Sequence, residues 1–452
     1  MAADSGRNGS GEFVLSADWE RAAAAAGGTA AFRVRIEAPE LPATQRRTPT
    51  DVAFVLDRSG SMGGEKIELA KQAVDEACRH LREDDRAALV VFDNEIDVLH
   101  RLEPATSRVK TGLRMALLGV DARGGTNLSG GWFAGCQELD PAAAGTPAGQ
   151  RVRRAILLTD GQANDGIVDP RELGRHANRL RQLGVGTTTL GLGLGFDEFL
   201  LSAMAEAGGG NFQFLETAAD LREFFEKELR ELLSVMALGM QVTVTCPEGV
   251  HLHPVSAFPA ERTGRTWTLA LGEAPAGERL DVVFEATVKP GFAGTEAAFA
   301  VEVAWSDPAA DERRSANVPL APLAVTTPEA AEAAEPHEAA AAAVALQRLA
   351  REKRRALEAD RRGDRESSMF YARSMQTMVM QAADLSGIDE EREDAAESIR
   401  MLLEAPLSEE DRKGMVWKAS LQRRNRGDWR ERRDRKQPDG PAAAPGGATG
   451  PA

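Results

Sequence analysis

The feature of this sequence that most constrains its fold is the alternation, between Asp51 and about Met236, of short apolar runs with amphipathic stretches. The apolar runs, which we interpret as strands, cover residues 51–57, 86–93, 153–160 and 185–195. The amphipathic stretches, which we interpret as helices, lie near residues 65–82, 107–118, 128–139, 171–183, 197–207 and 218–236. Strands that are apolar on consecutive residues are typical of a parallel sheet covered by helices on both faces. The pattern therefore predicts a doubly wound, mostly parallel α/β domain.

The segment from about Gly239 to Thr326 has a different pattern. Its runs QVTVTC, RTWTLAL, RLDVVFEATV and AFAVEVAW alternate apolar with polar residues and are separated by Gly and Pro turns, which predicts an antiparallel β-sandwich. Upstream of the α/β domain, the run AAFRVRIEA places Phe32, Val34 and Ile36 on one face of a lone strand. Because a lone strand needs a sheet to join, we expect both flanks of the α/β domain to build one sandwich.

Helical patterns dominate beyond Pro328. One amphipathic run ends at Gly363-Asp364, and a second helix is expected from roughly Ser367 to Leu385. Ser408 followed by Asp411 is typical of a helix start with a capping box. The expected organisation is a disordered N-terminus at residues 1–12, strands joining the sandwich at 13–48, the α/β domain at 49–237, the sandwich at 238–327, a helical module with a basic end at 328–436 and a disordered tail at 437–452.

Composition narrows the classes of function. With 42% hydrophobic and 28% charged residues, most of the 452-residue chain can bury a core. The N-terminus has no apolar signal region and no run reaches the ~18 apolar residues of a membrane helix, so we expect a cytoplasmic protein without a membrane span. The three cysteines are odd in number and far apart, which indicates reduced, packed thiols. A net charge of -15 disfavours nucleic acid as a partner.

Polar residues follow the first predicted strand directly. Asp57, Ser59 and Ser61 occupy alternate positions of a tight turn between that strand and a helix beginning near Gly64, and Gly60 is expected to let the backbone turn between the serines. These side chains then lie at the carboxyl edge of the sheet, where ligands bind in open α/β sheets. A carboxylate and two hydroxyls can converge on a single hard cation, for which oxygen ligands are preferred.

Two further loops supply matching oxygen groups. Thr126 lies in the run GGTN before a predicted helix, and Asp160 closes the apolar run AILLTD. We expect the five side chains to meet above one point of the sheet edge. Because the predicted site is hydroxyl-rich and at a loop edge, we also expect it to face solvent, so that substitutions there cost the fold little.

On the strength of these residues, the sequence resembles the von Willebrand factor A family over about residues 51–236. The metal-ion-dependent adhesion site of that family consists of Asp-x-Ser-x-Ser, then Thr, then Asp. All five positions of this motif match here. The resemblance implies that Ser59, Ser61 and Thr126 ligate through their hydroxyls, while Asp57 and Asp160 act directly or through waters. The implied ion is Mg²⁺, or Mn²⁺ or Ca²⁺. The resemblance further implies a bacterial, cytoplasmic adaptor that is not an enzyme and that binds an Asp or Glu of a partner protein through the ion.

Two other functions stay open at this point. Intracellular members of the family include subunits of AAA+ ATPase and chelatase assemblies, and this chain has no Walker A motif, so any ATPase would be a separate partner. A basic run from Arg423 to Lys436, with Trp417 and Trp429, could make the protein a scaffold that contacts nucleic acid. The alternative interpretation of this run is a solvated tail.

Three weaker signals have simpler explanations. The glycines at Gly191, Gly193 and Gly195 do not match the dinucleotide spacing G-x-G-x-x-G, and we expect them to allow close packing at a strand end. Asp57 could resemble the nucleophile of a phosphatase, but Ser59 stands where a second acid would be needed. The pair His251 and His253 is expected on an exposed strand rather than in a metal site.

Overall fold

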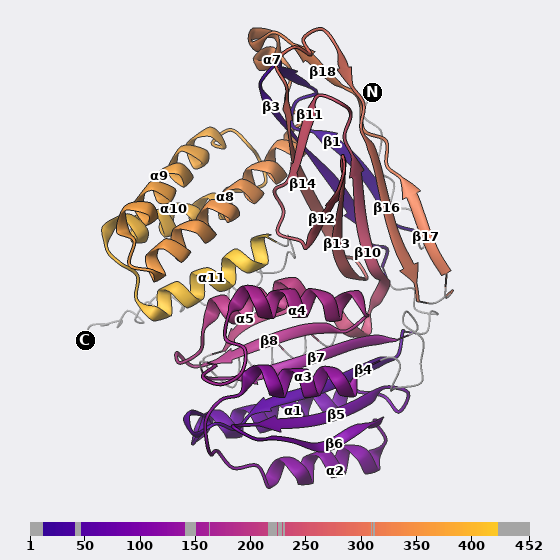
Figure 1. Ribbon diagram of the computed structural model, residues 1–452, viewed down its shortest axis with the longest axis vertical. Helices are drawn as coiled ribbons and strands as arrows, with labels where there is room; N and C mark the ends of the chain where they lie inside the picture. Colours follow the sequence, from indigo (N-terminus) through magenta and orange to yellow (C-terminus); the bar gives the residue numbers. More distant parts are fainter. Residues whose placement is uncertain are drawn as a thin grey trace, which may run out of the picture.

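The computed structural model describes residues 12–40, 47–140, 151–161, 163–215, 231–308, 310 and 312–423, together with residues 224 and 228. Three parts are visible in Figure 1: an α/β domain, a pair of antiparallel sheets above it, and a group of C-terminal helices beside both. The α/β domain carries the predicted site.

The centre of the α/β domain is a six-stranded sheet with the strand order β6-β5-β4-β7-β8-β9. Its strands are β4 (Thr50–Asp57), β5 (Arg86–Phe92), β6 (Ile96–Pro104), β7 (Val152–Thr159), β8 (Gly186–Leu192) and β9 (Gly209–Leu215). All neighbouring strands pair in parallel except β5 and β6, which are antiparallel. The doubly wound, mostly parallel sheet predicted from the sequence is therefore confirmed.

Helices cover both faces of this sheet. On one face, α1 (Glu65–His80) and α2 (Ser107–Leu118) pack on β4, β5 and β7. On the other face lie α3 (Leu128–Glu138), α4 (Pro170–Gln182) and α5 (Glu198–Gly208). Between them, β4 is buried along its whole length, which explains its uninterrupted apolar sequence.

Three elements differ from the sequence prediction, and one of them, β9, has no counterpart among the predicted strands. Strand β6 was not predicted either, because it is an exposed edge strand whose sequence IDVLHRLEP is neither continuously apolar nor regularly alternating. The helix predicted at 218–236 ends too late, because the strand β10 begins at Val235. The greater part of that predicted helix lies outside the described residues, although residues 224, 228 and 231–233 are helical.

Two antiparallel sheets flank the α/β domain. The first has the order β1-β3-β14-β11, built from β1 (Val14–Trp19), β3 (Thr29–Glu37), β14 (Arg279–Val288) and β11 (Val250–Pro254). The second has the order β12-β13-β10-β16-β17, built from β12 (Ala260–Thr263), β13 (Thr266–Pro275), β10 (Val235–Thr245), β16 (Ala300–Asp307) and β17 (Glu312–Asn317). A small third sheet joins β15 (Glu296–Ala297), β18 (Leu323–Thr326) and β2 (Ala23–Ala25).

Segments on the two sides of the α/β domain meet in the first of these sheets. Strand β3 pairs with β14 from Thr29 to Glu37, which places Phe32 opposite Phe284. The two rings are stacked with centroids 5.2 Å apart, and both are fully buried in a core shared by the two larger sheets. The strand before the α/β domain is thus stabilised by chain that follows it.

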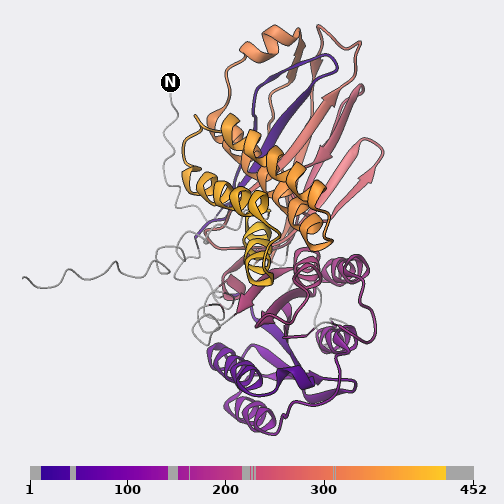
Figure 2. The ribbon, with the colours of Figure 1, turned by 90° about the vertical axis from the view of Figure 1, so that its left-hand side faces the viewer.

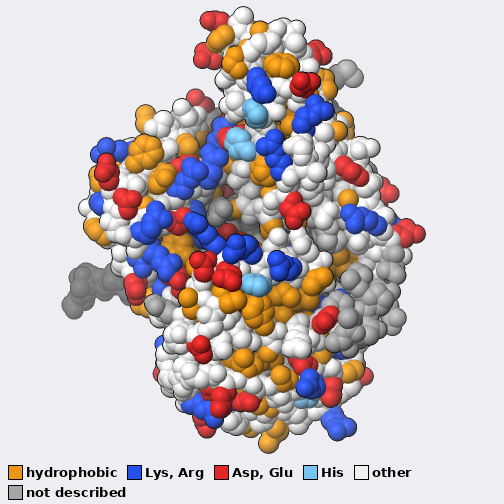
Figure 3. Space-filling model, in the orientation of Figure 1, with side chains coloured by type: hydrophobic (Ala, Val, Ile, Leu, Met, Phe, Trp, Pro, Cys, Tyr) orange, Lys and Arg blue, Asp and Glu red, His pale blue; other side chains and the backbone are white. Residues whose placement is uncertain are grey.

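The C-terminal part is helical. It comprises α7 (Pro328–Ala333), α8 (Glu338–Arg361), α9 (Arg365–Gln381), α10 (Asp389–Glu404) and α11 (Glu409–Arg423). At the start of α11, the Ser408 hydroxyl accepts a hydrogen bond of 3.1 Å from the Asp411 N–H, as its sequence predicts. In Figure 2 the helices α8 to α11 extend from the upper sheets to the α/β domain. Lys and Arg side chains gather around the hollow between these helices and the sheets (Figure 3).

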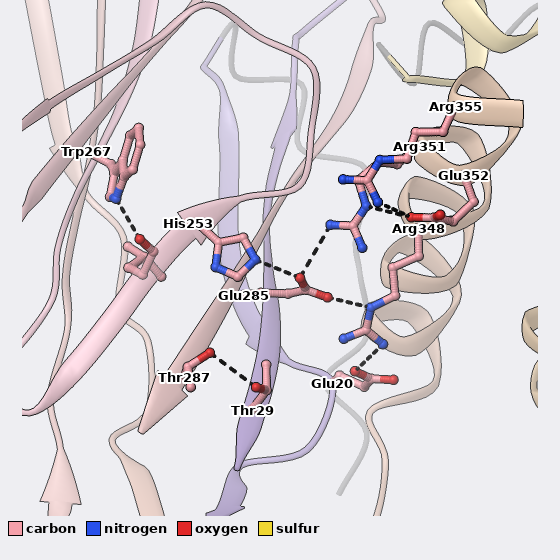
Figure 4. A network of polar contacts seen from close by, with 11 residues as sticks. Glu20, Thr29, His253, Trp267, Glu285, Thr287, Arg348, Arg351, Glu352 and Arg355 are labelled. Carbon is pink, nitrogen blue, oxygen red and sulfur yellow. Dashed lines mark hydrogen bonds and ion pairs between the residues drawn. The ribbon is translucent and has the colours of Figure 1, made fainter. Parts of the chain in front are cut away.

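An ion-pair network fastens α8 to the first flanking sheet (Figure 4). Glu285 of β14 accepts a hydrogen bond of 2.7 Å from Arg348 and one of 3.5 Å from Arg351. His253 of β11 contacts the same carboxylate at 2.9 Å. His251 and His253 lie on the exposed face of β11, whose Val250 and Leu252 are buried, and His253 contacts a carboxylate of the neighbouring strand.

Several sequence predictions concern chain ends. Residues 1–11 and 437–452 lie outside the described residues, as does the basic run after Arg423, including Trp429. Within the described part of the chain, no helix combines the length and the hydropathy that crossing a bilayer needs. All three cysteines are free and buried, and burial raises the pKa of the Cys78 thiol to about 12. The prediction of packed thiols that form no disulfide with one another is confirmed.

Candidate metal site

Asp57 is the last residue of β4, and its carboxylate is held from two sides. One oxygen accepts a hydrogen bond of 2.7 Å from the Ser59 N–H, and the other accepts one from the hydroxyl of Thr159 at the end of β7. Burial raises the pKa of Asp57 to about 6, although the hydrogen bonds from Thr159 and Ser59 act in the opposite direction. A cation beside this carboxylate would stabilise its charged form.

The two serines come next: Ser59 directly precedes the short 3₁₀ turn η1 (Gly60–Met62), and Ser61 lies within it. Their hydroxyl oxygens lie 3.2 Å apart, and the Ser61 hydroxyl donates a hydrogen bond of 2.8 Å to Asp160. The role expected for Gly60 is wrong, because Gly60 has no positive φ. Its N–H instead donates a hydrogen bond of 3.1 Å to the Gly124 carbonyl, which ties the serine turn to the loop carrying Thr126.

Thr126 lies directly before the N-cap residue of α3, so the start of this helix fixes its position. The next residue, Asn127, caps this helix by accepting a hydrogen bond of 2.9 Å from the Gly130 N–H. The Thr126 N–H donates to the Asn164 side chain at 2.9 Å. The loop after Asp160 therefore holds the loop that carries Thr126.

The side chains from different loops converge beside Gly161. A Cβ on Gly161 would lie 3.3 Å from the Thr126 hydroxyl oxygen and 3.6 Å from an oxygen of Asp57. Asp160 precedes this glycine and accepts the hydrogen bond from Ser61. The structure thus brings all five predicted residues, Asp57, Ser59, Ser61, Thr126 and Asp160, to one place at the carboxyl edge of the sheet.

The expectation that the site faces solvent is wrong. Asp57, Ser59, Thr126 and Asp160 are buried, with exposed fractions between 0% and 3%, and Ser61 alone of the five is exposed. The loop at residues 124–126 contacts the serine turn through Gly60, and Asn164 and Asp165 contact Thr126 in turn, so the side chains lie between packed loops. Substitution of a buried member is therefore expected to cost stability.

Sequence reasoning missed two residues of the site. Lys66 of α1 forms an ion pair with Asp160, and its ammonium also lies 3.3 Å from the Ser61 carbonyl. Thr159 holds Asp57, as described above. A signal for Thr159 was present, since it directly precedes Asp160, but a threonine inside an apolar strand is usually interpreted as packing.

The residue types fit a hard divalent cation. The site offers two carboxylates and three hydroxyls, all of them oxygen ligands. The converging groups meet where the missing Gly161 side chain leaves room. Among the described residues no group of three or more His, Cys, Asp or Glu could hold a metal ion, so a metal bound here depends on the hydroxyls.

The glycines at the end of β8 pack closely, as expected from the sequence. A Cβ on Gly191 would lie 2.5 Å from the ring of Phe196, and one on Gly195 would lie 2.5 Å from the carbonyl oxygen of Asp160. These contacts account for two of the glycines without a dinucleotide.

Comparison with curated proteins finds relatives that match parts of the chain. YfbK of Escherichia coli is 28% identical over 45% of this chain and 34% of its own length. The protein sll0103 of Synechocystis is 26% identical over 62% of this chain and 67% of its own. Human inter-alpha-trypsin inhibitor heavy chain H4 is 32% identical over 42% of this chain and 21% of its own length. The chain thus spans only about a third of YfbK and about a fifth of the human protein.

Solved structures extend the comparison to most of the chain. The von Willebrand factor type A protein of Catenulispora acidiphila aligns over 91% of this chain and 96% of its own, with a TM-score of 0.67 and 18% identity. The ArnB paralog VWA2 of Sulfolobus acidocaldarius aligns over 91% of this chain and 98% of its own, with a TM-score of 0.60 and 16% identity. At these identities the likeness concerns the fold alone. The von Willebrand factor type A domain family itself matches residues 51–227, and these residues of the chain therefore form a von Willebrand factor type A (vWA) domain.

Proposed function

We propose that the vWA domain is a metal-dependent protein-interaction module. Asp57, Ser59, Ser61, Thr126 and Asp160 would hold Mg²⁺, or Mn²⁺ or Ca²⁺, and an Asp or Glu of a partner protein would complete the coordination of the ion. The observation that carries this proposal is the convergence of oxygen groups from three loops beside Gly161.

Charge explains why the partner group should be acidic. Two carboxylates at most neutralise a divalent cation, and the three hydroxyls add no charge. Such an ion attracts a further anionic ligand and polarises it. The exposed Ser61 marks the side from which a partner can approach, because the other four side chains are buried.

A binding role is favoured over catalysis by the residue types. The site has one acid after β4 where a phosphatase needs two, and Ser59 occupies the second position. We therefore propose that the protein is not an enzyme. Turnover of a phosphate or peptide substrate by the purified protein, abolished in Asp57→Asn, would contradict this.

The cellular setting is proposed on chemical grounds. Three free, buried cysteines are compatible with a reducing compartment, and we place the protein in the bacterial cytoplasm. Within that setting the adaptor could serve a separate AAA+ ATPase or chelatase. Contact with nucleic acid through the basic stretch after Arg423 is the remaining alternative. In that case the affinity for nucleic acid would fall steeply with salt concentration.

Affinity capture tests the proposal. The wild-type protein and Ser61→Ala are immobilised and exposed to lysate in Mg²⁺ and in EDTA. The expected partner binds wild type in Mg²⁺, elutes with EDTA and does not bind Ser61→Ala. Replacement of one Asp or Glu of that partner by Asn or Gln should abolish the complex. A partner that binds equally in Mg²⁺ and in EDTA would contradict the proposal.

A further inference from the structure

The loop between β8 and α5 lies directly against a predicted metal ligand. At Gly195, the backbone approaches Asp160 so closely that a Cβ would lie 2.5 Å from the Asp160 carbonyl oxygen. Any shift of this loop toward the sheet edge must therefore move Asp160.

The same loop is also linked to Asp57, the other carboxylate of the site, through Gly191 and Thr159. The ring of Phe196, which is 1% exposed, packs on Gly191, where a Cβ would lie 2.5 Å away. Gly191 is the register partner of Thr159 in the pairing of β7 with β8. Thr159 in turn donates the hydrogen bond that holds Asp57. Phe196 therefore packs against β8 beside Thr159, the residue whose hydroxyl holds Asp57.

A lysine from the C-terminal helices holds this loop from the opposite side. The ammonium of Lys413, on α11, donates a hydrogen bond of 2.8 Å to the Phe196 carbonyl and one of 3.0 Å to the Glu198 carboxylate. It also lies 4.7 Å from the centroid of the Phe196 ring. The side chain of Lys413 is only 2% exposed, so these contacts replace its hydration.

Two neighbouring contacts also join the C-terminal helices to the loop between β8 and α5. Arg412 donates a hydrogen bond of 2.9 Å to Glu198, and Arg361, at the end of α8, makes a bidentate contact with Asp197 at 2.8 and 2.5 Å. Burial opposes the charge of Glu198, yet the hydrogen bonds from Arg412 and Lys413 keep the pKa of its carboxyl below the ordinary value. The loop is thus held by charges that belong to the helical part.

The helices that contact this loop also contact the first flanking sheet. Helix α8 is tied to the flanking sheet by Arg348 and Glu285, 2.7 Å apart (Figure 4). In Figure 2 the same helices extend from the sheets to the vWA domain. Docking of the helices on the sheets therefore fixes where Lys413 stands relative to the metal site.

We propose that Lys413 is a positioning residue for the metal site. By holding Phe196, it keeps the loop 193–198 packed behind Asp160 and Thr159, so the metal affinity of the vWA domain depends on the docked C-terminal helices. This inference rests on the proposed function, because it presupposes that the five side chains hold a divalent ion. It goes beyond that function by making the helical part a regulator of the site.

A matched pair of buried lysines tests the proposal. Lys353 is as buried as Lys413, with 2% exposure, and forms an ion pair of 2.8 Å with Asp394 inside the helical part. We compare wild type, Lys413→Met and Lys353→Met by calorimetric titration with Mg²⁺ and by thermal unfolding. Both substitutions should lower the melting temperature, because each leaves a buried carboxylate with one cation fewer. Lys413→Met alone should weaken Mg²⁺ binding, on the order of fivefold to tenfold.

A double variant keeps the test valid if Lys413→Met unfolds. Lys413→Met combined with Glu198→Gln removes both buried charges and should recover stability, but its Mg²⁺ affinity should stay weak because Phe196 is still not held. Equal affinity in wild type and in this folded double variant would overturn the inference while leaving the proposed function intact. Failure of the wild-type protein itself to bind Mg²⁺ would overturn both.

Discussion

Lys66 forms an ion pair with Asp160 at the carboxyl edge of the vWA sheet, opposite the hydrogen bond of 2.8 Å that Ser61 donates to the same carboxylate. Both oxygens of Asp160 therefore have partners from the chain itself. A divalent cation that uses Asp160 must compete with this ammonium. If the site holds a cation as proposed, Lys66 would therefore compete with that cation for Asp160.

Replacement of this lysine should strengthen metal binding. In Lys66→Met the carboxylate of Asp160 loses its resident cation, so we expect the Mg²⁺ dissociation constant to fall severalfold in calorimetric titration. The control is Lys71→Met on the same helix, whose ammonium contacts the exposed Glu68 at 2.8 Å and not the site. Weaker Mg²⁺ binding in Lys66→Met would instead make Lys66 part of the binding geometry.

Metal affinity should depend on pH through Asp57. Burial raises the pKa of this carboxyl from 3.8 to about 6, and Mg²⁺ needs the charged form. Affinity should therefore be constant well above about pH 6 and fall about tenfold per pH unit below it. Titrations between about pH 5 and about pH 8 check this, and a flat profile would show that the pKa is not raised.

The same shift predicts how the metal-free fold responds to pH. A carboxyl with a raised pKa stabilises the folded state fully below its unfolded value, and that contribution is lost as the pH rises through the folded value. The metal-free protein should therefore lose stability between about pH 4 and about pH 7 through Asp57, and Mg²⁺ should restore it. Chemical unfolding of wild type and Asp57→Asn in EDTA measures the difference, and identical pH profiles would refute it.

Burial separates two kinds of substitution at the site. Asp57→Ala leaves the Ser59 N–H and the Thr159 hydroxyl without their buried acceptor, so it should cost roughly 1–3 kcal/mol of unfolding free energy. Ser61 is exposed, and Ser61→Ala should cost less than about 1 kcal/mol. Denaturant unfolding in EDTA ranks the two variants. A larger loss in Ser61→Ala would contradict the burial of Asp57.

Truncation tests the contribution of the first strands. Removal of Met1 to Pro39 deletes β3 and exposes Phe284, which stacks on Phe32 in the intact protein. The shortened chain should aggregate or melt at a lower temperature. The cut must spare Arg47, because its buried ion pair with Asp85 belongs to the vWA domain. Removal of Met1 to Gly11 alone is the control, and equal stability of both shortened chains would contradict the shared core.

The sequence predicted the vWA sheet because its central strands are buried on both faces and therefore apolar throughout. It predicted the convergence of Asp57 and Asp160 because β4 and β7 are parallel neighbours and end at the same edge. The sequence did not predict β6, because this partly exposed edge strand is neither continuously apolar nor regularly alternating between apolar and polar residues.

The burial of the site and its outer contacts needed the structure. Short polar side chains in loops suggest solvent, and only the tertiary contacts of Gly60 and Thr126 reveal the loops that cover them. Nothing in the sequence distinguishes Lys66 from the other charged residues of its amphipathic helix. Lys413 is separated from Glu198 by 215 residues, and no local pattern connects residues so far apart.

We propose that the five converging side chains hold a divalent cation. Calorimetric titration of the metal-stripped protein with Mg²⁺, compared between wild type and Ser61→Ala, tests it most directly because Ser61 is the exposed member and its loss should leave the fold intact. We predict a single saturable site in wild type and at least about tenfold weaker binding in Ser61→Ala, at an unchanged melting temperature without metal. Absence of Mg²⁺ binding in wild type, or equal affinity in the two proteins, would contradict the account.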